Sequence, residues 1–487
     1  MIVNFDYLFL VIFGIILTVW GINMKYDFII VGAGPSGIFA AYELLKQKDQ
    51  LKILMIEKGR SIDERFCPKR RSDRCACCSP CNITTGFSGA GAFSDGKLSL
   101  NEHGEIGGNL GEYLKQDEFV KILNYTDQIY LDLGADDKIY GQENTAEILE
   151  IKRKAIRCNL KLIESGVRHL GTEKAFAIYQ KLQKKLEQQG VEFLFNTEVT
   201  DLIIANDKIK GIVAGQLYEA KRVVIAVGRE GCSWFDEICN KYQINRKSGI
   251  IDIGVRIECD SNITKIIDEA NYESKLINYT NTFDDKVRTF CWNPRGEVTE
   301  ERYENNLALV NGHSYKDEKL KTNNTNLALL VSKNFTEPFK SPVEYGKHIA
   351  RLANMLSDGK VIVQTYGDFK RGRRTTPSRL KRNNTQPTLK DAVPGDLSLV
   401  FPYRLMLDIK ETIESLDKLM AGFAGDGTLL YGVEVKFYSN RLILDDNFQT
   451  NIGNLYALGD GAGITRGLMQ ASMNGIAFAR KMKKNIN

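Results

Sequence analysis

Short apolar runs closed by glycine alternate with amphipathic stretches along this chain. The first run, 28–31, is rich in β-branched residues and ends at a glycine, which is typical of a buried parallel strand. In the stretch that follows, Ile38, Ala41 and Leu44 recur on one helical face, and a second apolar run spans 53–56. The pattern predicts a strand, a helix and a parallel strand, which together form a βαβ unit.

The same signals recur toward the end of the chain. An amphipathic helix is expected over 173–189, where the pattern stops at a glycine. Further strands are expected over 191–195, 199–204, 209–213 and 221–229, with a last strand within 451–463 and a closing helix over 468–484. Mixed short strands and polar loops over 251–403 indicate a second, inserted domain.

These elements predict an α/β protein with a Rossmann-like nucleotide-binding fold and an inserted α+β substrate domain. The nucleotide-binding domain is expected in three pieces, 24–109, 166–235 and 441–487. A largely helical insertion, 110–165, and the substrate domain, 236–440, separate these pieces, and a segment 1–23 precedes them.

The glycine-rich turn after the first strand is the first candidate binding site. Gly32, Gly34 and Gly37 have the GxGxxG spacing, in which the glycines serve a tight turn, a close approach to a pyrophosphate and helix packing. Pro35 suits the first helical turn, whose free N–H groups favour an anion. Glu57 follows Gly37 by twenty residues. A carboxylate at this position can accept hydrogen bonds from both ribose hydroxyls and would repel a 2′-phosphate. FAD or NAD therefore fits, and NADP does not.

A second glycine-rich stretch spans 83–98 and is interleaved with large apolar residues. Phe87 and Phe93 argue against a solvated linker, so the backbone is expected to lie flat against a planar ligand. Lys97 and Asp95, within the same stretch, could donate a proton or hold a carbonyl, or could cap local backbone.

Three separated segments together resemble the FAD-binding fold of the glutathione-reductase superfamily: the GxGxxG unit with its acid, the strand over 223–229, and 450–460. By this resemblance Asp460 binds the ribityl chain of FAD, and backbone groups at Lys58 and near Val199 hold its ADP half. The residues expected to contact FAD are Gly32, Gly34, Pro35, Ser36, Gly37, Glu57, Lys58, Gly89, Gly91, Val199, Gly228, Gly459, Asp460 and Gly467.

A closer resemblance covers nearly the whole chain. The segments 89–98, 169–173, 430–439 and 459–471 resemble a group of bacterial FAD-dependent dehydrogenases whose substrate is generally unassigned. No second GxGxxG follows a strand after residue 100, so electrons are expected from transient NAD(P)H, from a partner or from the substrate itself.

The flavin is expected to perform hydride transfer while the protein supplies orientation and charge. Arg466, just before the closing helix, is predicted to be a cation near the flavin or a structural residue of the helix start. His169, one of four histidines, is either catalytic or a satisfied polar residue. The catalytic candidates are Lys97, Asp95, His169 and Arg466.

Five of the ten cysteines crowd into 67–81. Cys78 and Cys81 have the spacing of a redox dithiol, and nearby arginines would favour thiolates. Cys75, Cys77, Cys78 and Cys81 could instead bind zinc or an iron-sulfur cluster. The third alternative is a loop with no bound group. No evenly spaced disulfide framework is present, which favours the cytoplasm.

Charge and composition narrow the function further. The chain has 487 residues, 43% of them hydrophobic, and a net charge of +5. The segment 370–382 carries seven positive charges and no acid, so the rest sums to about −2 (5 − 7). Because the positive charge is local, it argues against a protein that coats nucleic acid along its whole surface. The segment could bind an anionic substrate, a nicotinamide phosphate, an acidic electron carrier or RNA, or could be a solvated loop.

Residues 7–22 form an uncharged run slightly short of the roughly 17 to 25 residues that cross a bilayer. Positive charge begins at Lys25, which would place the protein on the cytoplasmic face of a single anchor. The alternative is an overextended start before Met24.

The sequence thus predicts a cytoplasm-facing FAD oxidoreductase that acts on an organic small molecule by hydride transfer, and the basic segment would suit an anionic one. The alternatives are a flavoprotein that binds or modifies RNA, and an electron-transfer flavoprotein with a protein partner.

Overall fold

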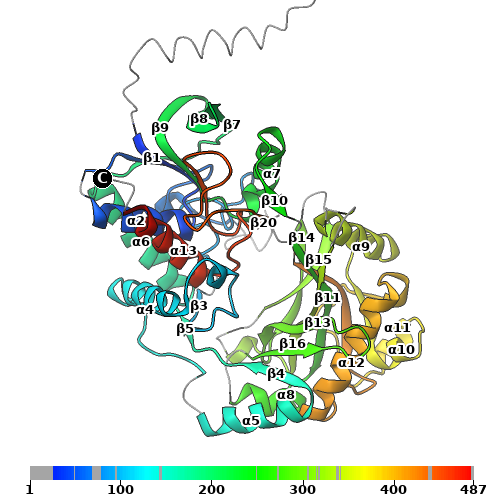
Figure 1. The fold of residues 1–487 in the computed structure, drawn as a ribbon. Helices are drawn as coiled ribbons and strands as arrows, with labels where there is room; N and C mark the ends of the chain where they lie inside the picture. Colours follow the sequence, from blue (N-terminus) through cyan, green and yellow to red (C-terminus); the bar gives the residue numbers. More distant parts are fainter. Residues whose placement is uncertain are drawn as a thin grey trace, which may run out of the picture. The chain divides into compact units, whose positions relative to one another are not determined.

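The structure is a computed structural model of residues 1–487. It describes 26–483 except 49, 69–77, 94–95, 142–144, 248, 271–273, 304–306, 314, 316–317, 336–338, 340–341 and 437–440. The chain forms two compact units (Figure 1). The first unit contains 1–137, 168–247 and 439–487, and the second contains 138–167 and 248–438.

A mostly parallel sheet forms the centre of the first unit, in the order β6-β2-β1-β9-β8-β7, and β21 also pairs with β9. Its strands are β1 (Tyr26–Val31), β2 (Ile53–Ile56), β6 (Glu192–Leu194), β7 (Asp201–Ala205), β8 (Lys208–Ala214), β9 (Gln216–Ile225) and β21 (Leu455–Ala457). β1 pairs in parallel with β2 and β9, so the predicted βαβ unit and its return strand are confirmed. The predicted Rossmann-like α/β fold is therefore present.

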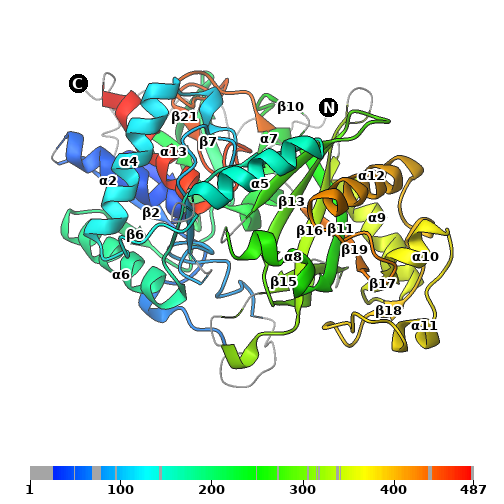
Figure 2. The ribbon, with the colours of Figure 1, turned by 90° about the horizontal axis from the view of Figure 1, so that it is seen from below.

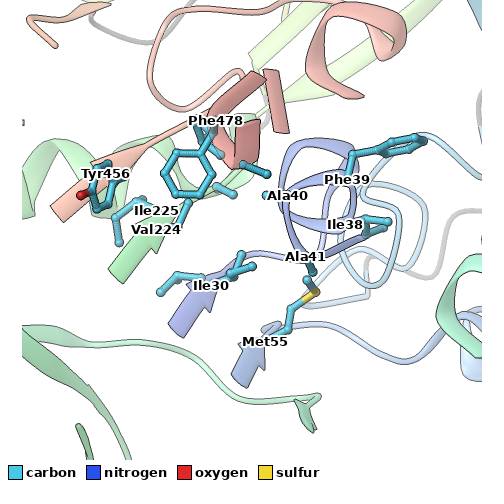
Figure 3. Close-up of a cluster of buried hydrophobic side chains, with 14 of the residues drawn as sticks. Ile30, Ile38, Phe39, Ala40, Ala41, Met55, Val224, Ile225, Tyr456 and Phe478 are labelled. Carbon is cyan, nitrogen blue, oxygen red and sulfur yellow. The ribbon is translucent and has the colours of Figure 1, made fainter. Parts of the chain in front are cut away.

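Helices α2 (Pro35–Gln47) and α13 (Leu468–Met482) lie side by side in the first unit (Figure 1). Figure 3 shows Phe478 of α13 close to Tyr456 and Ala40, and the Phe478 ring is 5.2 Å from the Tyr456 ring. The remaining elements are β3 (Lys97–Ser99), α4 (Gln116–Asp132), β5 (Val167–His169), α6 (Thr172–Gln188), α7 (Cys232–Lys241), β10 (Arg246–Lys247) and β20 (Arg441–Leu442).

The predicted helical insertion 110–165 is divided between the two units. Phe119 and Ile122 of α4 are buried in the hydrophobic core of the first unit. Ile148 and Ile151 of α5 (Thr145–Arg157), with β4 (Leu160–Ile163), belong to the core of the second. Helical periodicity does not reveal which core an apolar face packs against. The sequence therefore predicted one insertion where the structure has helices in two cores.

An eight-stranded sheet forms the second unit, in the order β18-β17-β19-β11-β16-β13-β12-β4. Its other strands are β11 (Ile250–Asp260), β12 (Lys275–Tyr279), β13 (Lys286–Asn293), β16 (Asn324–Asn334), β17 (Ile362–Thr365), β18 (Val393–Pro394) and β19 (Leu429–Lys436), and β14 (Glu297–Tyr303) pairs with β15 (Leu307–His313). The helices are α8 (Ser261–Asp268), α9 (Pro342–Leu356), α10 (Tyr366–Lys370), α11 (Pro377–Lys381) and α12 (Tyr403–Leu419). Figure 2 shows α9 and α12 beside β11 and β19.

Side chains alternate strictly along β11. Ile251, Ile253, Val255 and Ile257 are fully buried in the hydrophobic core with residues of α9 and α12. The opposite face carries Asp252, Arg256 and Glu258, which are also fully buried. Because strand side chains point alternately to opposite faces, one strand separates an apolar layer from a layer of buried charge.

Arg256 is the centre of this charged layer. Its guanidinium binds both oxygens of Glu434 on β19, at 2.8 and 2.9 Å. Its remaining donors reach Asn326 Oδ1 at 2.8 Å, the Cys291 carbonyl at 3.2 Å and Asn311 Oδ1 at 3.3 Å. The fully buried charge is thus both paired and hydrogen-bonded, as burial requires.

A second ion-pair cluster predicts how the second unit responds to acid. Arg404 donates to Asp285 at 2.6 and 2.9 Å, and Lys333 also pairs with it. Burial acts to raise the pKa of Asp285, but these cations outweigh burial and hold the pKa at about 2, below the ordinary 3.8. A lowered folded-state pKa adds stability above pH 3.8 that is lost as the pH falls toward 2.

We therefore expect the Asp285→Asn variant to lose less stability than the wild type as the pH falls across that window. Urea unfolding at a series of pH values measures the slope. Glu344→Gln, an exposed acid in the same unit, serves as the control and should keep the wild-type slope. Equal slopes for wild type and Asp285→Asn would contradict the prediction.

Within the described part of the chain no helix is long and apolar enough to cross a membrane. The predicted anchor at 7–22 lies outside the described residues.

Candidate functional site

The glycine turn after β1 is tightly packed at two glycines and open at the third. A Cβ on Gly32, whose φ is +102°, would lie 2.7 Å from the Ala226 oxygen, and one on Gly37 would lie 2.3 Å from the Gly32 oxygen. A Cβ on Gly34 would meet only the Ala226 oxygen, at 4.0 Å. Gly34 also precedes Pro35, the first residue of α2, and supplies no side-chain cap. An open face beside a helix N-terminus suits a pyrophosphate.

The second glycine-rich stretch lies against this turn. The Ser88 N–H donates to the Ala33 oxygen at 2.7 Å, and a Cβ on Gly89 would lie 3.7 Å from the Gly34 Cα. A Cβ on Gly91 would lie 3.2 Å from both the Tyr179 ring and the Leu468 side chain. Close approach to other segments of the chain therefore requires small residues here, and the expected contact with a planar ligand stays a prediction.

The segment 459–460, near the C-terminal end of the chain, lies against the glycine turn 32–37. Gly459 has a φ of +76°, and a Cβ there would lie 2.7 Å from the Ser36 hydroxyl. Asp460, beside it, accepts a hydrogen bond from the Thr465 hydroxyl at 2.7 Å. Gly228, after β9, has no atom within 4 Å of its Cβ position. Segments hundreds of residues apart thus converge on Gly34.

Glu57 binds backbone at three places. Its Oε2 accepts the Ala33 N–H at 2.9 Å, and its Oε1 accepts those of Gly59 and Gly86 at 2.9 and 3.1 Å. A carboxylate has about four acceptor positions, so one remains for a ribose hydroxyl. Glu57 therefore joins both glycine stretches, a function that its spacing alone did not indicate.

Two other residues predicted to contact FAD, Ser36 and Lys58, have side chains with partners in the protein, and a third, Val199, is buried. The Ser36 hydroxyl donates to the Ala471 oxygen at 2.9 Å, which leaves its backbone N–H as the group that faces an anion. Lys58 Nζ donates to the Glu230 oxygen at 3.4 Å. Val199 is buried just before β7.

Arg65 is a site residue that sequence reasoning missed. Its buried guanidinium donates to the oxygens of Asn82 (3.0 Å), Ile83 (2.7 Å), Phe87 and Gly89 (2.7 Å), and to the Ser88 hydroxyl. Burial lowers its pKa to about 10, so it stays charged at neutral pH. Arg65 organises the whole turn that contacts Gly34. Its position in an arginine-rich loop gave no signal of this.

The structure places two of the four catalytic candidates on paired strands. Lys97 begins β3 and His169 ends β5, which pair, and the Leu170 N–H donates to the Gly96 oxygen at 3.0 Å. Asp95 lies outside the described residues. The Arg466 N–H donates to the Gly107 oxygen at 2.8 Å, next to Gly467, the N-cap of α13. Their catalytic roles stay predictions.

Cys78 and Cys81 form no disulfide, and Cys81 is exposed. Cys75 and Cys77 lie outside the described residues. Among the residues that the structure describes, no three His, Cys, Asp or Glu side chains gather as a metal site. The dithiol, metal and ligand-free alternatives stay predictions.

The basic segment 370–382 is partly neutralised within the second unit. Asp426 pairs with Lys370 at 3.0 Å and Arg371 at 2.8 Å. Asp368, which is buried, pairs with Arg373 at 2.6 Å and Arg379 at 3.9 Å. Arg373 thus already pairs with a carboxylate of the chain itself. Pairing of four of the seven cations weakens the charge on which the RNA alternative rests.

Residues 250–437 match the family model described as "FAD-dependent protein, C-terminal domain-like". The matched residues are almost all of the second unit, and the first unit supplies the dinucleotide cradle. This match indicates that the chain depends on FAD. Its cofactor is FAD, and membership of the glutathione-reductase superfamily stays a prediction.

Among known proteins, an uncharacterised protein of Clostridium beijerinckii is 26% identical to this chain over an alignment of 477 residues, which covers 93% of this chain and 79% of the relative. Solved structures with similar chains include L-proline dehydrogenase from P. horikoshii (12% identity, 95% of each chain, TM-score 0.38) and formate oxidase from Aspergillus oryzae (12% identity, 95% and 99%, TM-score 0.43). At these values the solved structures carry no information about the substrate.

The cradle fits FAD. Gly34 offers an open backbone face, α2 begins beside it, Gly89 and Gly459 flank it, and Glu57 keeps one acceptor position. These residues would hold the pyrophosphate and ribose, and FAD supplies two-electron chemistry when bound.

We expect Gly34→Ala to fold normally but to bind FAD about 10- to 100-fold more weakly, because the new methyl group occupies the open face. The backbone of Gly34 (φ −77°, ψ 177°) suits alanine. Fluorescence titration of apoprotein with FAD measures the affinity. Gly37→Ala is the matched contrast: its Cβ would lie 2.3 Å from the Gly32 oxygen, so it should lower the melting temperature as well. Unchanged FAD affinity in Gly34→Ala would contradict this prediction.

Proposed function

We propose that the protein transfers a hydride between the flavin of FAD and an organic small molecule. The observation that supports this most strongly is the convergence of 32–37, 88–91 and 459–460 on one open turn. Such a cradle holds the cofactor's phosphates, while the reacting ring needs further side chains for proton transfer and charge. Lys97, His169 and Arg466 belong to the same unit as the cradle.

Within this proposal Lys97 and His169 act together. When the substrate is oxidised, a hydride leaves its carbon for the flavin and a proton leaves its heteroatom for a base. Lys97 and His169, on the paired strands β3 and β5, are our candidates for that base and for the group that holds the heteroatom. In the reverse direction the same groups would return the proton to a carbonyl.

We assign Arg466 a charge-stabilising role. It directly precedes Gly467, the N-cap of α13, so a guanidinium and a helix N-terminus lie close together in the chain. Both favour negative charge, such as that of a reduced flavin. The Arg466 backbone is held by Gly107, which fixes where its side chain begins.

The proposed partners are a small anionic substrate and a source of electrons. The basic segment 370–382 keeps a positive surplus after pairing with Asp368 and Asp426, which would favour an anion. Reduced nicotinamide or an acidic electron-carrier protein would supply or remove the two electrons.

Anaerobic photometry of the purified full chain tests the proposal. We expect the protein to take up FAD, to show a flavin spectrum, and to lose that colour on reduction with NADH or NADPH. Lys97→Met and His169→Gln should keep the FAD spectrum and slow the turnover of any substrate found by screening with an artificial electron acceptor. Lys121→Met, an exposed lysine on α4, is the control and should behave as the wild type. A folded preparation that takes up no FAD would overturn the proposal.

A further inference from the structure

Asn474 on α13 lies, fully buried, at the junction of two glycine segments. Its Oδ1 accepts the Gly459 N–H at 2.7 Å. Its neighbour Gly475 lies so close to α2 that a Cβ would be 2.3 Å from the Ser36 oxygen. Asn474 therefore stands between the Gly459 turn and the first turn of α2.

The amide nitrogen of Asn474 has no hydrogen-bond partner in the described part of the chain. Asn474 Nδ2 is buried and has no hydrogen-bond acceptor among the described residues. Reversing the amide would not help, because its nitrogen would then face the Gly459 N–H, which is also a donor. Buried donors are almost always satisfied in folded proteins. An acceptor is therefore required beside Gly459.

The chemistry of the cradle indicates what that acceptor is. The Ser36 hydroxyl, which lies next to Gly459, already donates to the Ala471 oxygen. The first turn of α2 is where a dinucleotide pyrophosphate binds, and its oxygens are strong acceptors. An amide donor beside this turn complements such an oxygen.

We propose that Asn474 binds the pyrophosphate of FAD through Nδ2, directly or through one water, while its Oδ1 positions the Gly459 turn. This inference rests on the binding of FAD in the cradle. Asn474 would then connect the closing glycine segment to the same phosphates that the first glycine turn holds. FAD binding would order the Gly459 turn through this single side chain.

Asn474→Asp is the decisive variant. It keeps an oxygen for the Gly459 N–H and replaces the donor with a second oxygen that repels phosphate. We expect the FAD affinity of the apoprotein to fall about 10- to 100-fold, the range for a lost hydrogen bond to a charged group. The FAD affinity of Asn474→Ala should fall less, because this variant removes the donor without adding an oxygen that repels phosphate. Fluorescence titration with FAD measures both, and thermal unfolding of the apoproteins reports stability separately.

Ser472→Ala is the matched control on the same helix. Ser472 is equally buried, and its hydroxyl donates to the Leu468 oxygen at 2.9 Å and contacts the Tyr130 hydroxyl at 2.8 Å. Its loss should lower the melting temperature of the apoprotein and leave the FAD affinity unchanged. Comparison with this control shows whether an Asn474 variant loses FAD affinity through a lost cofactor contact or only through lower stability.

Phosphorus NMR of bound FAD gives a readout that does not depend on stability. We expect the pyrophosphate resonances to shift in Asn474→Ala and not in Ser472→Ala. Wild-type affinity in Asn474→Asp, or unshifted resonances in Asn474→Ala, would overturn the role of Asn474. A wild-type apoprotein that binds no FAD would instead overturn the proposed function, and this inference with it.

Discussion

Replacing Arg65 with methionine is expected to lower the free energy of unfolding by about 2–4 kcal/mol and to weaken FAD binding. Methionine keeps most of the volume but removes every donor that now reaches the oxygens of Asn82, Ile83, Phe87 and Gly89. The buried Phe87 carbonyl would cost about 1–3 kcal/mol without a donor, and the part-buried carbonyls of Asn82 and Gly89 would cost less. The loosened turn includes Gly89, which lies against Gly34, so cofactor affinity should fall together with stability.

Urea unfolding and FAD titration of the same preparations test this prediction. Arg65→Lys is the matched variant, because it keeps the charge but cannot direct five donors in a planar fork. It should lie between wild type and Arg65→Met in both measurements. Arg60→Met, an exposed arginine five residues earlier, should match the wild type in stability. An Arg65→Met protein as stable as the wild type would show that water satisfies these carbonyls.

The buried pair of Arg256 and Glu434 predicts the second large effect. Either Arg256→Met or Glu434→Gln is expected to lower the free energy of unfolding by about 3–5 kcal/mol. Glu434→Gln leaves Arg256 buried without an anion, and Arg256→Met leaves the buried Glu434 with Lys436, at 3.0 Å, as its cation. Burial acts to raise the pKa of Glu434, but Arg256 and Lys436 hold it below its usual value, so Glu434 is ionised at neutral pH. The double variant removes both charges, so its free energy of unfolding should fall clearly less than the sum of the falls in the two single variants.

A double-mutant cycle by urea unfolding gives the coupling energy. The pair Arg404→Met and Asp285→Asn, whose arginine is half-exposed, provides a comparison in the same unit and should show weaker coupling. Additive losses at Arg256 and Glu434 would mean that the two charges do not stabilise each other. The prediction concerns stability only, since all five contacts of Arg256 are to the protein.

Local patterns predicted the first unit well. The run 28–31, the glycine spacing at 32–37 and the second run at 53–56 are β1, the turn into α2, and β2. Each depends on neighbours within a few residues, since a strand needs alternation or a continuous apolar run and a helix start needs Pro35. The segment 110–165 was predicted as one insertion, but its helices belong to the cores of two different units. An amphipathic pattern is the same whichever core receives the apolar face, so the sequence could not show this.

The polar contacts of the site depended on the fold. Glu57 was predicted from its spacing to meet a ribose, yet three backbone N–H groups bind it, one of them from Gly86. The basic segment was predicted as one positive run, yet Asp426, more than forty residues away in sequence, pairs with two of its cations.

The sequence by itself determined the βαβ unit and the glycines of the cradle, because these follow from side-chain periodicity and backbone freedom over short distances. Only the tertiary structure decided which charges are neutralised and which donors lack a partner. Arg65, Asn474 and Arg256 show no local pattern that distinguishes them from surface residues. A hydrogen bond is set by the position of both its atoms, and the second atom here belongs to a segment that only folding brings near.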